Sequence, residues 1–122
     1  MSGIQNNSLT LFYPKAGVVA GTVTVTAGTP ALGSLTSGPS TSVAYGLVTI
    51  VDNGTGDFTI SVKDFKGPMG LVLGFGNGAT LGTILNPQVG TYSGNTASVQ
   101  FLVADAAAAA SDTNFNFVIL AF

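Results

Sequence analysis

Alternation of apolar and polar residues is the dominant pattern of the chain, and it is clearest between residues 46 and 64. From residue 57 to residue 63 every second residue is apolar (Phe58, Ile60 and Val62), and those between are polar. A period of two is typical of a strand with one buried and one solvated face. A second apolar run precedes it across a cluster of Gly, Asn, Asp and Thr, so the segment predicts a β-hairpin.

The two aspartates of this segment predict the register of the hairpin. A four-residue loop would place Asp52 directly opposite Asp57, and like charges in that position destabilise a strand pair. We expect a three-residue loop, which avoids this contact, and we expect Ile50 to lie opposite Phe58. The charges therefore favour the three-residue loop.

Runs of the same kind predict strands along most of the chain. Residues 69–75 place large apolar side chains on one face and Gly70 and Gly74 on the other, which indicates close backbone approach or a sheet edge. The last run, 114–122, is apolar on both faces in its final part, so a second layer or another subunit must cover both sides. Besides the two arms of the hairpin, the predicted strands are residues 9–13, 18–26, 69–75, 81–85, 89–93, 97–104 and 114–122.

Seven to nine short strands separated by turn signals predict an all-β fold, an antiparallel β-sandwich or a jelly roll. We expect a flexible N-terminal arm over residues 1–7 and a single domain over residues 8–122. Residues 27–42 are rich in Gly, Pro, Ser and Thr and predict a long surface loop. Loops of this length inside a compact domain are uncommon and often functional, so we expect a partner to order it.

Charged residues are scarce, with three lysines and five aspartates among 122 residues. The surface of a soluble small domain usually carries about 25–35 % charged residues. We therefore expect an obligate assembly in which other subunits cover part of the surface; a surface solvated by Ser, Thr, Asn and Gly is the alternative. Three lysines cannot neutralise a phosphate backbone, which excludes nucleic acid as a partner. No apolar run reaches the roughly 20 residues that span a bilayer, so we expect no membrane contact.

Side chains that carry acid–base, nucleophilic or metal chemistry are few. Without His or Cys, the usual catalytic triads and zinc sites are impossible. The aspartates cluster in predicted turns, where they would stay ionised and could not act as the buried acid of a glycosidase. Residues 52–57 look superficially like a calcium loop, but Gly54 and Gly56 occupy ligand positions and Lys63 the twelfth position. The sequence predicts no catalytic residue, no cofactor and no metal site, so we expect that the protein is not an enzyme.

Two segments resemble a known family. Residues 56–65 form an alternating strand that begins with Gly-Asp-Phe, and residues 112–120 lead into an aromatic and aliphatic strand near the C-terminus. Together they are similar to small virion structural proteins of tailed bacteriophages, the decoration or cement proteins. The alanine run 106–110 stands where a loop with Gly and Asp would be expected in that family.

The resemblance implies a non-enzymatic protein of the virion, assembled in the host cytoplasm, that binds the outer capsid lattice and reinforces it. Its partners would be other copies of itself, as a homotrimer, and the major capsid protein. A tail-fibre or receptor-binding tip and a self-polymerising fibre or pilin-like subunit are the alternative functions. The expected partner contacts lie in the arm, the 27–42 loop and the final strand. The candidate interface residues are Leu32, Leu35, Val118, Leu120 and Phe122.

Overall fold

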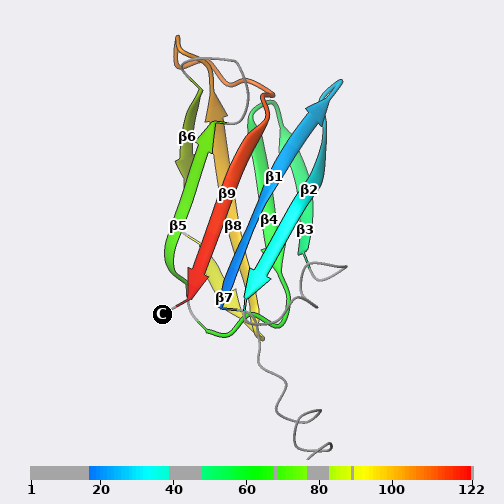
Figure 1. The fold of residues 1–122 in the computed structure, drawn as a ribbon. Helices are drawn as coiled ribbons and strands as arrows, with labels where there is room; N and C mark the ends of the chain where they lie inside the picture. Colours follow the sequence, from blue (N-terminus) through cyan, green and yellow to red (C-terminus); the bar gives the residue numbers. More distant parts are fainter. Residues whose placement is uncertain (1–16, 39–47, 68, 77–82, 89, 122) are drawn as a thin grey trace, which may run out of the picture.

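The computed structural model describes residues 17–38, 48–67, 69–76, 83–88 and 90–121, and over these residues the chain is an all-β sandwich (Figure 1). Two antiparallel sheets pack face to face, as the alternating pattern predicted. The predicted arm and the predicted strand 9–13 lie outside the described residues. The strands are β1 (Val18–Thr26), β2 (Thr29–Gly38), β3 (Val48–Gly54), β4 (Asp57–Val62), β5 (Met69–Gly76), β6 (Ile84–Pro87), β7 (Thr91–Ser93), β8 (Thr96–Ala104) and β9 (Phe115–Ala121).

The strand order shows how distant parts of the chain meet. The first sheet has the order β2-β1-β9-β5, so the last strand lies between the first strand and the fifth. The second sheet has the order β3-β4-β8-β6, and β7 also pairs with β8. The final strand is therefore an interior strand of the first sheet, hydrogen-bonded on both edges.

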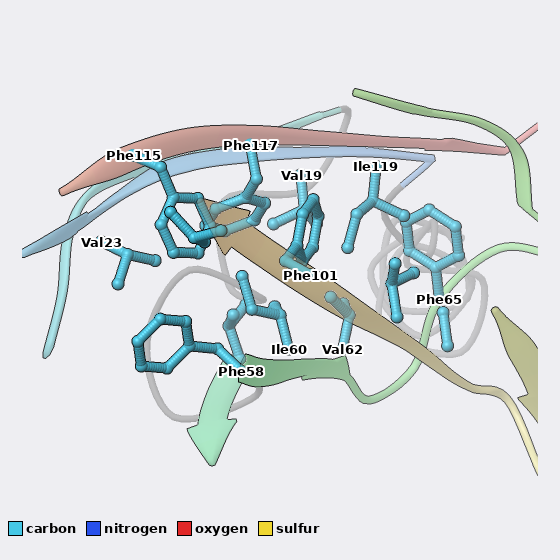
Figure 2. Packing of buried hydrophobic residues seen from close by; sticks show 14 residues of the cluster. Val19, Val23, Phe58, Ile60, Val62, Phe65, Phe101, Phe115, Phe117 and Ile119 are labelled. Carbon is cyan, nitrogen blue, oxygen red and sulfur yellow. The ribbon is translucent and has the colours of Figure 1, made fainter. Parts of the chain in front are cut away.

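The core lies between the two sheets and is built from the side chains on the inward face of each strand (Figure 2). Side chains of β1 and β9 point toward those of β4 and β8. Phe115 is at its aromatic centre, with its ring centroid 5.8 Å from that of Phe58 and 5.5 Å from that of Phe101. Full burial of one such side chain stabilises the fold by about 1.5–3 kcal/mol.

The prediction of a long loop over residues 27–42 is wrong for most of that stretch, because it contains strand β2 (Thr29–Gly38). Ala27 and Gly28 form a two-residue turn in which both residues have positive φ (52° and 83°), and β2 returns along β1 in antiparallel pairing. Pro30 is tolerated because β2 is an edge strand of the first sheet. The remainder of the predicted loop, 39–42, lies outside the described residues.

The hairpin of β3 and β4 is confirmed, but its predicted register is wrong. Ile50 pairs with Ile60, two residues beyond the expected partner. A register shift between Asp52 and Gly54 places Gly54 opposite Asp57. Asp52 lies opposite Phe58 and Asp57 opposite Gly54, so the strand pairing on both sides of the bulge keeps the two aspartates apart.

Candidate interaction surface

The two sheets differ sharply in charge. The described strands of the first sheet contain no Asp, Glu, Lys or Arg. The charged residues within the described ranges lie on the second sheet or in connections, and they are Asp52, Asp57, Lys63, Asp64, Lys66, Asp105 and Asp112. The described strands on one broad side of the sandwich, in front in Figure 1, are therefore uncharged.

The outer side of this uncharged sheet carries a continuous set of apolar side chains. On β9, Val118 lies between Leu73 of β5 and Ala20 of β1, and the next outward residue, Leu120, lies between Leu71 and Val18. Exposed fractions of 41 %, 46 % and 51 % for the three large residues of β5 show that they face solvent. We call the following seven residues the apolar face: Val18, Ala20, Leu71, Leu73, Phe75, Val118 and Leu120.

Packing against the second sheet decides which side of β5 faces outward. A Cβ atom placed on Gly74 would lie 3.2 Å from Leu85 and 3.2 Å from the ring of Phe101, so the backbone of β5 closely approaches the core at this position. Val72, two residues earlier, packs against the core from the same side. Because side chains alternate along a strand, Leu71, Leu73 and Phe75 then point away from the core.

The structure divides the predicted interface residues into three groups. Val118 and Leu120 are half-buried and belong to the apolar face. Leu32 and Leu35 are also half-buried, but they pack against the protein's own core, because β2 is a paired strand and not a loop. Phe122 lies outside the described residues. The large residues of β5 were missed as interface candidates, although the glycines on the opposite side of that strand were a usable signal.

A hollow of about 360 Å³ lies at one end of the second sheet. Leu102 and Ala104 of β8 line it together with Ile84 of β6, which is 45 % exposed. The carboxylate of Asp57, also in its wall, accepts hydrogen bonds from the Gln100 amide at 2.8 Å and from the Asn53 amide at 3.2 Å. The lining is thus largely apolar, and its carboxylate is engaged in structural hydrogen bonds.

The alanine run 106–110 forms a tight loop at the wall of this hollow. One carboxylate oxygen of Asp105 accepts the backbone N–H of Ala107 at 2.9 Å and that of Ala109 at 3.0 Å. The hairpin turn of β3 and β4 is tied to the neighbouring segment, because the Gly56 N–H donates to Asp112 Oδ1 at 2.7 Å. These bonds connect the loops at the wall of the hollow to the neighbouring backbone.

The described part of the chain contains no group of three or more Asp, Glu, His or Cys residues that could hold a metal ion. Nor do its residues form any helix long and apolar enough to cross a membrane. No family model matches the chain, and searches of curated proteins and of solved structures find no match. The apolar face is thus the feature of the described structure that calls most strongly for a functional explanation.

Proposed function

We propose that this protein is a non-enzymatic structural protein of a virion, a capsid decoration or cement protein that binds the outer capsid lattice and stabilises it. The observation that carries the proposal is the apolar face on an uncharged sheet. Large contiguous apolar patches on a soluble protein mark surfaces that a partner covers. A structural subunit of an assembly has such a partner permanently.

The shape of the apolar face favours a protein partner over a small ligand. Sites for small molecules are concave and bury most of the ligand, whereas this face is the outer side of a sheet. The cores of protein–protein interfaces are depleted in charged residues, as the four strands of this sheet are. A partner that presents its own side chains to the sheet would remove Leu73 and Phe75 from water.

The low net charge of −2 also suits a lattice-bound protein. Copies that lie side by side on a capsid repel one another when each carries a large charge of one sign. A decoration protein that associates with itself and with the major capsid protein would also bind several lattice positions at once. Each further contact then forms at high effective concentration, which multiplies a weak single affinity.

The proposal is tested with purified protein and expanded capsids of the virus whose genome encodes the chain, prepared without this protein. We expect the protein to co-sediment with the capsids and to saturate them at a fixed number of copies. Bound protein should also raise the temperature at which the capsids break, measured by differential scanning calorimetry. A stable monomer that does not co-sediment with the capsids would contradict the proposal.

A self-polymerising fibre subunit is the second candidate, and the edges of the first sheet favour it. Edge strands of soluble proteins usually carry charged residues that prevent pairing with another chain, and the described edge strands β2 and β5 carry none. Such a subunit should form filaments at micromolar concentration, visible by electron microscopy. A closed oligomer of fixed size would exclude this candidate.

A further inference from the structure

We propose that the partner of the apolar face is a second copy of this chain, which packs its own apolar face against the first around a two-fold axis. The inference deepens the proposed function, on which it rests for its biological role, by naming the occupant of the face. The contact makes a dimer in which two uncharged sheets lie face to face. It replaces the homotrimer that the family resemblance implies.

The outer side of the first sheet lies near the lower limit of the area that a stable dimer needs. Four strands about 4.8 Å apart and seven residues long, at about 3.3 Å per residue, outline roughly 440 Å². Side chains that stand up from the sheet raise the accessible area above this flat outline. Stable interfaces bury about 600–1,000 Å² on each partner, so the first sheet reaches the lower part of this range only when most of its outer side is covered.

The chemistry of the face selects a partner like itself. A charged side chain placed against this sheet would lose its hydration and find no opposite charge on the four strands. The second sheet of another copy is a poorer partner, because β3 and β4 bring Asp52 and Asp57. The outer side of the first sheet is the broad surface in the described structure that is both apolar and uncharged.

The arrangement of residues within the face gives it an apolar centre and a polar end. Leu73 and Val118 are paired neighbours at the centre, and a two-fold axis beside them would bring both pairs together. At one end Asn116 lies between Phe75 and Thr22, which gives the contact part of a polar rim. Stacked sheets lie about 10 Å apart with strands within about 30° of each other, a geometry that lets the leucines and valines interdigitate.

A lysine on the face tests the inference against a matched control on the other sheet. Leu73→Lys places a charge at the proposed centre, and Val51→Lys places it on β3, where the native valine is similarly exposed, at 53 % against 46 %. By analytical ultracentrifugation we expect the native protein and V51K to be dimers. L73K should dissociate with a Kd at least 100-fold higher, because each dimer would bury two unpaired charges.

Single-cysteine variants supply a second test that leaves the face apolar. The chain contains no cysteine, so any disulfide in Leu73→Cys must join two copies. Under mild oxidation at micromolar concentration, L73C should cross-link at least ten times faster than Val51→Cys. Equal cross-linking rates, or a native protein that is monomeric or trimeric in solution, would overturn the inference.

Capsid binding separates this inference from the proposed function. A native monomer that still saturates capsids would overturn the two-fold dimer and leave the decoration function standing. A native dimer that L73K dissociates, but that has no capsid affinity, would support the dimer and contradict the decoration function.

Discussion

Replacing Gly56 with alanine tests the contact between the β3–β4 turn and the end of β8. Gly56 has a φ of 65°, in the left-handed region that favours glycine. A Cβ atom at this position would overlap the carbonyl oxygen of Val103 and lie 2.8 Å from the Ser111 nitrogen. Both atoms belong to the backbone, so neither can move without shifting its strand or loop. The alanine methyl group therefore cannot be accommodated where the turn now lies.

The expected magnitude follows from the bonds that a shifted turn would lose. A residue other than glycine in the left-handed region costs about 1–2 kcal/mol. The turn would also lose the hydrogen bond from the Val103 N–H to the Gly56 carbonyl oxygen, 2.8 Å long, and the charge-assisted bond from the Gly56 N–H to Asp112, 2.7 Å long. Together these bonds contribute about 2–4.5 kcal/mol, so Gly56→Ala should lower the free energy of unfolding by about 3–6.5 kcal/mol.

Gly94→Ala is the matched control, because Gly94 has a φ of 58° and a Cβ atom added to it would have no atom within 4 Å. This variant should lower the free energy of unfolding only by the cost of placing alanine in the left-handed region, about 1–2 kcal/mol. Urea denaturation followed by far-ultraviolet circular dichroism measures both variants, and equal m-values would show that the unfolded states are comparable. If the two variants differ by less than about 0.5 kcal/mol, the turn is not held by this contact and the reasoning is wrong.

Three further substitutions test the core and a half-buried tyrosine hydroxyl. Phe115→Leu removes a fully buried ring from contact with two other phenylalanines, and it should lower the free energy of unfolding by about 1–3 kcal/mol. The control, Phe75→Leu on the outer side of the first sheet, should change the free energy of unfolding by about 0.5 kcal/mol or less. Similar losses in both variants would mean that the sheets do not pack as described. Tyr92→Phe removes a hydroxyl that lies 2.9 Å from the Phe65 carbonyl oxygen. This substitution should lower the free energy of unfolding by about 0.5–1.5 kcal/mol, measured by thermal denaturation. An unchanged melting temperature would show that this hydrogen bond does not stabilise the fold.

The strands themselves could be predicted because the period of two is a local property. In β4 and β8 each buried residue is two positions from the next, so a short window of sequence contains the whole signal. The fold class followed from the number of such windows and the turns between them. The interface expected in the final strand stays a prediction; Val118 and Leu120 of that strand belong to the apolar face.

Strand β2 could not be predicted in this way, because its composition is typical of a loop. Its stability as a strand comes from backbone pairing with β1 and from the packing of Leu32 and Leu35 against the core. The pairing of Ile50 was missed for a different reason. A three-residue loop over residues 54–56 places Ile50 opposite Ile60, as observed, so the expected partner Phe58 did not follow from the expected loop. The bulge beside Gly54 is a separate irregularity that no charge or hydrophobic pattern indicates.

The sequence by itself determined that β5 has one side of large apolar residues and one side with glycines. It could not determine which side faces the core, because alternation is symmetric between the two faces of a strand. Only the tertiary structure decided this, since the ring of Phe101 on the opposite sheet fits against the bare backbone at Gly74. Leu71, Leu73 and Phe75 are left on the outer side, and the proposed interaction surface exists for that reason.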